Sequence, residues 1–270
     1  MSSEEISDVA AARDRDRETR DRALFDAIAK QYCRKDMLPA HRRARQLRLF
    51  QTLERGGIAN PTSVLEVGCG AGFAARYLLG RYGAYLGIDY SSDLIAYAQS
   101  MNTVPAAEFR VCNANEFESD RKFDVIFMIG VLHHLPDPVG TLRHLRKFLK
   151  KDGVIAVNEP QRGNPLIHIS RLIRKKLDPN YSADQDEYTR KQIFDLMKAA
   201  GLDDVKIYPQ GILTTPFAEV IVPLQAVASP FCAALCAIDR WLESAIPSVL
   251  TNIAWNAIAV AKPHPDKDAA

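Results

Sequence analysis

The run Val64-Leu65-Glu66-Val67-Gly68-Cys69-Gly70-Ala71-Gly72-Phe73 constrains this chain more than any other stretch. Its branched apolar residues predict a buried strand, and the three alternating glycines predict a sharp turn. Apolar residues at helical spacing follow, at Ala74, Ala75, Leu78 and Leu79. Because glycine has no Cβ, such a turn can approach a ligand closely, and the first N–H groups of the following helix point at the same place. The turn is therefore a candidate binding surface for a nucleotide-like molecule.

The spacing of the glycines, together with one acid, indicates the kind of nucleotide. The dinucleotide fingerprint places its third glycine three residues after the second, but here that position is Phe73 and the third glycine is Gly72. Glu66 puts a carboxylate at the end of an otherwise apolar strand. That charge would repel a pyrophosphate, and it would attract the ammonium group of an amino-acid moiety, directly or through water. The turn therefore suits a cationic nucleoside without phosphates.

At these residues the sequence resembles the class I S-adenosylmethionine (SAM) methyltransferases, whose first motif has the form Glu-x-Gly-x-Gly-x-Gly. Three later segments, residues 84–89, 109–114 and 123–138, match further motifs of that family in order and at compatible spacing. The resemblance is close over residues 60–160 and loose in the flanks. It implies SAM as the cofactor. It also implies an α/β, Rossmann-like, doubly wound, mostly parallel seven-stranded sheet with N-terminal helices and a helical cap insertion.

The resemblance also implies which residues would hold SAM. The candidates are Glu66, Gly68, Cys69, Gly70, Gly72, Asp89, Tyr90, Asn113, Ala114, Ile129 and Tyr32. Gly68 and Gly70 would approach the methionine part, and Gly72 would allow the helix to contact the sheet. Asp89, 19 residues after Gly70, would accept hydrogen bonds from both ribose hydroxyls.

The expected adenine contacts include one departure from the family pattern. The family usually has an aspartate where this chain has Asn113; an amide oxygen can still accept the bond from the adenine amino group, but without charge assistance. The Ala114 N–H would meet a ring nitrogen, and Tyr90 would pack on the adenine face. For Ile129, core packing is an equally good explanation. Tyr32 is placed like a family tyrosine near SAM, and packing of an amphipathic helix explains it as well.

The reaction that SAM implies is an in-line displacement on a sulfonium methyl group, for which a general base matters most when the acceptor is a hydroxyl. The candidate bases are His134, His133 and Glu159, all expected at strand ends facing the pocket. His134 is the first choice, because a histidine can take a proton near neutral pH. A structural role in the loop is the alternative for each. No metal site is predicted, since the five cysteines form no CxxC pair.

Composition and periodicity predict one domain. A chain of 270 residues with 47% hydrophobic and 25% charged residues has the make-up of a soluble globular protein. We expect residues 1–22 to be a frayed tail and residues 23–263 to be one methyltransferase domain. Within it, residues 23–57 form N-terminal helices and 60–160 the SAM-binding core. Residues 161–250 form a helical cap and the sixth strand, and 251–262 form the last strand.

Net charge and sequence motifs indicate which classes of molecule the chain is expected to bind. A net charge of +2 gives no bias toward nucleic acid, and no nucleic-acid partner is expected. Residues 129–132 replace the Asn/Asp-Pro-Pro-aromatic run typical of methyltransferases that act on amino groups of bases and glutamine. The apolar stretch 212–238 and the basic segment 171–176 favour a small, apolar or amphiphilic acceptor, as in the similar quinone-biosynthesis and natural-product methyltransferases, with methylation at oxygen. The amino terminus has no apolar signal core, so a cytoplasmic setting is expected.

Several alternatives stay open from the sequence. The chain could bind SAM or its product without turnover, methylate a nucleic acid or a protein, or be an NAD-dependent oxidoreductase. Residues 217–238 could form a substrate cap, a homodimer surface or a peripheral membrane contact. Insertion across a membrane is disfavoured, because Glu219, Pro223 and Pro230 interrupt the apolar stretch.

Overall fold

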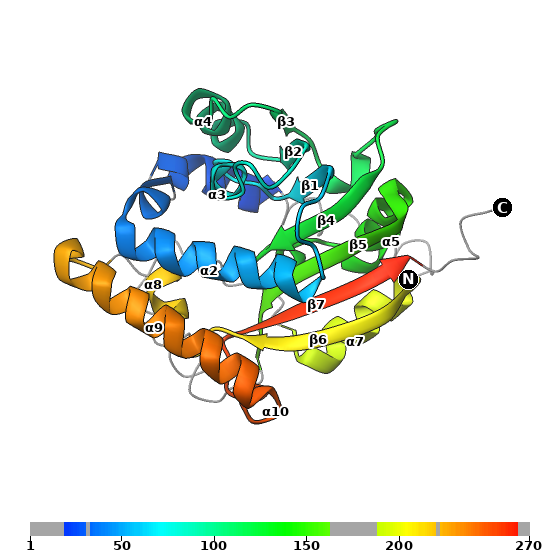
Figure 1. The fold of residues 1–270 in the computed structure, drawn as a ribbon. Helices are drawn as coiled ribbons and strands as arrows, with labels where there is room; N and C mark the ends of the chain where they lie inside the picture. Colours follow the sequence, from blue (N-terminus) through cyan, green and yellow to red (C-terminus); the bar gives the residue numbers. More distant parts are fainter. Residues whose placement is uncertain (1–18, 31–32, 163–187, 220–221, 264–270) are drawn as a thin grey trace, which may run out of the picture.

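A computed structural model of the chain describes residues 19–30, 33–162, 188–219 and 222–263. Its centre is a seven-stranded sheet in the order β3-β2-β1-β4-β5-β7-β6 (Figure 1). The strands are β1 (Ser63–Val67), β2 (Ala84–Asp89), β3 (Ala107–Val111), β4 (Phe123–Ile129), β5 (Leu149–Pro160), β6 (Leu202–Gln210) and β7 (Asn256–Pro263). Only β7 runs antiparallel to its neighbours β5 and β6. The expected Rossmann-like, mostly parallel sheet is confirmed.

Helices connect the parallel strands, as right-handed crossovers require. They are α3 (Phe73–Tyr77), α4 (Ser92–Met101) and α5 (Pro138–Leu145). The Ser91 side chain accepts a hydrogen bond from the Leu94 N–H at 3.2 Å and caps α4, and Pro138 occupies the first turn of α5. Serine and proline are favoured at these two positions.

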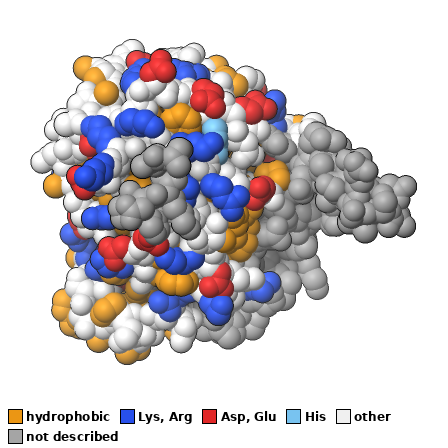
Figure 2. Space-filling view, turned by 90° about the vertical axis from the view of Figure 1, so that its right-hand side faces the viewer, with side chains coloured by type: hydrophobic (Ala, Val, Ile, Leu, Met, Phe, Trp, Pro, Cys, Tyr) orange, Lys and Arg blue, Asp and Glu red, His pale blue; other side chains and the backbone are white. Residues whose placement is uncertain are grey.

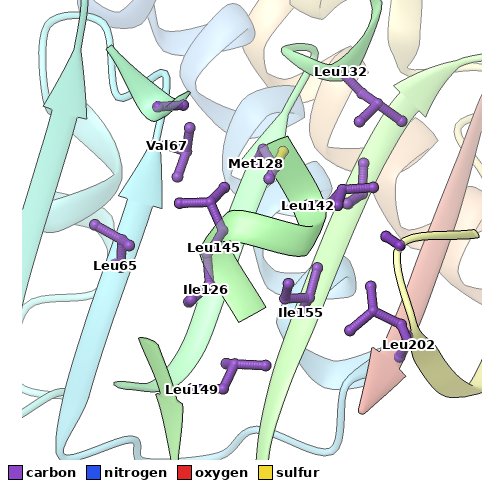
Figure 3. Packing of buried hydrophobic residues seen from close by; sticks show 14 of the residues in the cluster. Leu65, Val67, Ile126, Met128, Leu132, Leu142, Leu145, Leu149, Ile155 and Leu202 are labelled. Atoms are coloured by element: carbon purple, nitrogen blue, oxygen red, sulfur yellow. The ribbon is translucent and has the colours of Figure 1, made fainter. Parts of the chain in front are cut away.

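The core lies on both faces of the sheet, since side chains alternate along each strand. On one face, α5 packs on the central strands, where the labelled residues of Figure 3 meet: Leu65, Val67, Ile126, Met128, Leu132, Leu142, Leu145, Leu149, Ile155 and Leu202. On the other face, Leu49 and Leu53 of α2 (Pro39–Arg55) pack among alternate residues of the same strands, including Val125 and Phe127. Helices on both faces leave the carboxyl ends of the strands as the place for a ligand.

The N-terminal helices begin earlier than expected. Residues 19–30 and 33–37 are helical, so the assignment of residues 1–22 to a frayed tail is wrong for residues 19–22. The charged side chains of that stretch suggested solvation, but Asp21 is buried. It lies one helical turn before Phe25, on the face that packs inward.

The C-terminal third carries α7 (Arg190–Ala199), α8 (Thr215–Glu219), α9 (Gln225–Ala245) and α10 (Pro247–Leu250). In Figure 1, α9 lies alongside α2, and α10 follows at its end. The expected break in the apolar stretch falls between α8 and α9, whereas α9 continues through Pro230. The basic segment 171–176 lies outside the described residues. Within the described ranges, no helix is both long and apolar enough to cross a membrane.

Candidate functional site

The turn after β1 requires glycine at several positions. Gly68, Gly70 and Gly72 all have positive φ angles, of 70°, 51° and 71°, which favour glycine. A Cβ on Gly68 would lie 2.4 Å from a methyl carbon of Val131, and one on Gly72 would lie 2.5 Å from the Phe109 ring. At Gly68 and Gly72, both backbone conformation and space therefore exclude larger residues.

A cleft opens beside this turn, at the carboxyl ends of the strands. It measures about 810 Å³, a volume that includes the open solvent at its mouth. It is lined by Phe25, Val67, Gly68, Gly70, Ile88, Asp89, Tyr90, Leu94, Cys112, Asn113, Ala114, Asn115, Ile129, Gly130, Val131, His134, Leu135 and Pro136. Mostly apolar walls with a few polar groups suit a nucleoside.

Asp89 is the acid of the cleft, at the end of β2. Its two carboxylate oxygens accept hydrogen bonds from the N–H groups of Gly70, at 2.8 Å, and Ser91, at 2.9 Å. Burial raises the pKa of Asp89, and these two N–H bonds oppose the rise. Since each carboxylate oxygen can accept more than one hydrogen bond, Asp89 can bind a pair of hydroxyl groups as well.

Glu66 lies in the core behind the turn and does not line the cleft. Its carboxyl group accepts a hydrogen bond from the Tyr85 hydroxyl. Burial raises the pKa of Glu66 to about 8, although the Tyr85 bond lowers it. Cys69 is buried as well and is likewise absent from the lining.

The side chains expected around adenine lie together at the cleft. Asn113 begins the short 3-10 turn Ala114–Glu116, and its amide oxygen accepts the Asn115 N–H at 3.1 Å. Tyr90 packs edge-on against Phe25, with ring centroids 6.3 Å apart. Ile129 ends β4 and lines the same cleft. Tyr32 lies outside the described residues.

Glu159 and His133 form a buried pair that holds the loop after β4. One Glu159 oxygen accepts the N–H groups of Val131 and Leu132, both at 2.8 Å, and the other lies 2.6 Å from His133 Nδ1. Burial would raise the pKa of Glu159, but His133 and these N–H groups lower it overall. Neither residue lines the cleft, so the geometry favours the alternative of loop hydrogen bonding for both.

His134 is the candidate base that the structure places at the cleft. Its Nδ1 lies 3.1 Å from a carboxylate oxygen of Asp21, and Phe25 packs on it edge-on at 5.3 Å between ring centroids. Burial and the neighbouring His133 lower the pKa of His134. The lowered pKa favours the neutral ring. In the tautomer that donates Nδ1–H to Asp21, the lone pair lies on Nε2.

Asp21 is the site residue that the sequence analysis missed. Its signal was present, because Asp21 lies three and four residues before Leu24 and Phe25, on the same helical face. The run of alternating acids and arginines before it hid that periodicity. The interaction with His134 joins positions 113 residues apart, which no local pattern reveals.

Comparison with known proteins agrees with this geometry. The model of a family described as "Methyltransferase domain" matches residues 58–211. Among curated relatives, a ubiquinone biosynthesis O-methyltransferase of Pseudomonas paraeruginosa is 29% identical over 157 residues. That match covers 56% of this chain and 66% of the relative, so the chain spans slightly less than two thirds of the relative's length.

Solved structures show the same fold. The Haloferax volcanii complex of the Trm112 methyltransferase activator with a putative methyltransferase contains a chain with a TM-score of 0.62 and 18% identity, covering 89% of this chain and 98% of that one. The plantazolicin methyltransferase BamL, in complex with a triazolic desmethylPZN analog and S-adenosylhomocysteine (SAH), has a TM-score of 0.59 at 17% identity, covering 94% of this chain and 99% of that one. Because the family model spans more than half of the chain, the protein belongs to the class I SAM-dependent methyltransferases.

Proposed function

We propose that the protein transfers the methyl group of SAM to a hydroxyl oxygen of a small, apolar or amphiphilic acceptor. The observation that carries this proposal is the convergence of three groups on one cleft: the crowded glycine turn, the Asp89 carboxylate and the neutral imidazole of His134.

In this proposal, the residues of the cleft hold SAM as a nucleoside. Asp89 accepts hydrogen bonds from the ribose hydroxyls, Asn113 and the Ala114 N–H bind adenine, and Tyr90 and Ile129 enclose it. Gly68 and Gly70 lie against the methionine part. Glu66 acts through water from behind the turn, because its carboxyl group does not reach the cleft wall. An ammonium group nearby would favour its charged form and lower its raised pKa.

The chain's main contribution to catalysis is positioning. Bound SAM supplies a methyl group on a sulfonium, a leaving group that needs no protonation. Orienting two reactants can provide roughly 7–11 kcal/mol of the barrier. His134 then accepts the proton of the acceptor hydroxyl on Nε2, a step that typically adds about 10²–10⁴-fold. Asp21 holds the Nδ1 proton and fixes the tautomer.

The acceptor class follows from the cleft and from the relatives. The walls around His134 are apolar, since Phe25, Val131 and Leu135 line the cleft with it. The curated relative acts in ubiquinone biosynthesis as an O-methyltransferase, and another, of Acetivibrio thermocellus, is a malonyl-[acyl-carrier protein] O-methyltransferase. We therefore place a phenol with an apolar tail first among acceptors. A carboxylic acid comes second, because its carboxylate is already ionised at pH 7 and would not need His134 as a base.

The test is transfer of tritium from [methyl-³H]SAM to a panel of alkylated catechols, phenols and long-chain acids. We expect solvent-extractable label with one of these classes. With a catechol or phenol, His134→Ala should lose that label at nearly unchanged SAH affinity. Thermal stabilisation by SAH but no label with the panel or a cell extract would favour a non-catalytic SAM-binding protein. Stabilisation by NADH instead of SAH would favour the oxidoreductase.

A further inference from the structure

Helix α9 buries polar side chains and exposes large apolar ones, which is the reverse of the usual arrangement of a helix that packs on a protein core. Its buried residues are Ala228, Ser229, Cys232, Asp239 and Glu243. Its large apolar side chains point outward instead: Val227 is 69% exposed, Phe231 57% and Trp241 66%. A surface helix normally buries its apolar stripe and exposes its charges.

Two carboxylates fix this orientation. Asp239 accepts the N–H groups of residues 212, 213 and 214 and the Thr214 hydroxyl, at 2.6–3.2 Å. Glu243 accepts the Gly211 N–H at 2.6 Å and a hydrogen bond from the Gln51 side chain. Turning the apolar face inward would break these bonds and leave buried polar groups unpaired, at about 1–3 kcal/mol each. The outward apolar face is therefore part of the folded structure.

The apolar surface continues past both ends of the helix. Leu224, at its start, is 79% exposed, and Ile246, Val249 and Ile253, after its end, are exposed as well. Residues 222–238 include no charged side chain. We call this surface, from Leu224 to Ile253, the α9 face. By contrast, the face of the molecule in Figure 2 mixes basic and acidic side chains with scattered apolar ones, as solvent-exposed surfaces do.

The charged side chains around the α9 face are mainly basic. Arg43 of α2 is exposed and donates a hydrogen bond to Ser229 at 3.0 Å. Near the other end, Arg55 donates to the Glu243 carbonyl at 3.3 Å, and Arg240 pairs with Glu54. Arginines therefore border the apolar surface at both ends. The acids in these contacts are Glu54, which pairs with Arg240, and Glu243, which is buried.

We propose that the α9 face docks on the surface of a membrane that contains anionic lipids. An apolar helix face with an aromatic residue and an arginine border matches the boundary between acyl chains and negatively charged headgroups. In this proposal α9 lies along the membrane surface. Asp239 and Glu243 hold the opposite face of the helix on the protein, because they accept hydrogen bonds from the backbone N–H groups of Thr214 and Gly211.

A second copy of the chain fits this surface less well. Symmetric pairing of two α9 faces, parallel or antiparallel, would bring arginine borders together, and like charges oppose association. A specific protein interface also carries about one hydrogen bond per 100–200 Å². Within α9, which the structure describes over its whole length, Arg240 and Ser244 are the only exposed polar side chains.

The test is flotation of the full chain with vesicles of equal parts POPC and POPG, and with vesicles of POPC alone. We expect binding to the anionic vesicles that weakens with added salt. The Phe231→Ser/Trp241→Ser double variant should bind at least about tenfold more weakly, because two aromatic side chains no longer leave water on docking. The control, Leu79→Ser/Phe194→Ser, removes two other exposed apolar side chains and should bind like the parent. Trp241→Ser alone serves if the double variant unfolds.

Binding of the α9-face variants at the parent level would overturn the proposal, and so would failure of the parent chain to bind. A parent dimer that the double variant dissociates, with no vesicle binding, would assign the face to self-association instead. SAH affinity is measured on the same samples. It should not change in any variant, which keeps this test separate from that of the methyltransferase activity.

Discussion

Gly68→Ala is the substitution that most sharply tests the structure of the glycine turn. An alanine there would adopt a left-handed conformation, which is unfavourable by about 1–2 kcal/mol. Its Cβ would also lie 2.4 Å from a methyl carbon of Val131, and overpacking of this kind typically adds about 1–3 kcal/mol. We therefore expect the free energy of unfolding to fall by about 2–5 kcal/mol, and SAH affinity to fall with it because the turn forms the cleft wall.

Gly57 offers a matched control. It has the same φ of 70°, with no atom within 4 Å of an added Cβ. Gly57→Ala should thus show the conformational effect alone, about 1–2 kcal/mol, and leave SAH binding unchanged. Val131→Ala removes the methyl groups that the new Cβ would meet. In urea unfolding, the Gly68→Ala/Val131→Ala double variant should therefore be less destabilised than the sum of the two single variants, by a coupling energy of about 1–3 kcal/mol. Equal losses for Gly57→Ala and Gly68→Ala, with normal SAH binding by both, would refute the close packing of the turn.

Three further outcomes follow from the site. Asp89→Asn should raise the Kd for SAH in calorimetry at least about tenfold, because charge-assisted hydrogen bonds contribute about 1.5–3 kcal/mol; unchanged affinity would remove Asp89 from the ribose site. Since the pKa of Glu66 rises from 4.5 to about 8 on folding, the folded chain holds more protons between these values. The free energy of unfolding should therefore fall as pH rises from about 4.5 to 8, a slope that Glu66→Gln should reduce. Asp21→Asn should lower the pKa of His134 further in an NMR titration of the imidazole, because the carboxylate raises it; no change would mean that Asp21 does not act on the ring.

The strands and the cleft could be read from the sequence because their signals are local. The bounds of β2, Ala84–Asp89, coincide with the first of the matched later segments, residues 84–89, where an apolar run ends at an acid. The glycines after β1 signal their own conformation in the same way. Parallel strands place their carboxyl ends at one edge, so Asp89, Asn113 and Ile129 were expected together and do line one cleft.

The roles of the ionisable groups could not be predicted in this way, because they depend on side-chain direction. Glu159 ends a strand as expected, yet it points to the N–H groups of Val131 and Leu132 and is fully buried. The inward face of the first helix brings Asp21 to His134 across most of the N-terminal half of the chain. Both outcomes are set by tertiary contacts that no spacing rule encodes.

The orientation of α9 could not be predicted for a related reason. The apolar stretch left a substrate cap, a homodimer surface and a peripheral membrane contact open, although apolar helix faces usually turn inward. Two acids late in the helix, Asp239 and Glu243, decide otherwise by binding backbone N–H groups of residues 211–214.

A crystal structure of the chain with SAH tests the central claim most directly. The account predicts the ribose hydroxyls within hydrogen-bond distance of the Asp89 carboxylate, adenine beside Asn113 and Ala114, and the homocysteine part against Gly68 and Gly70. SAH bound elsewhere, or a cleft that excludes it at saturating concentration, would contradict the account.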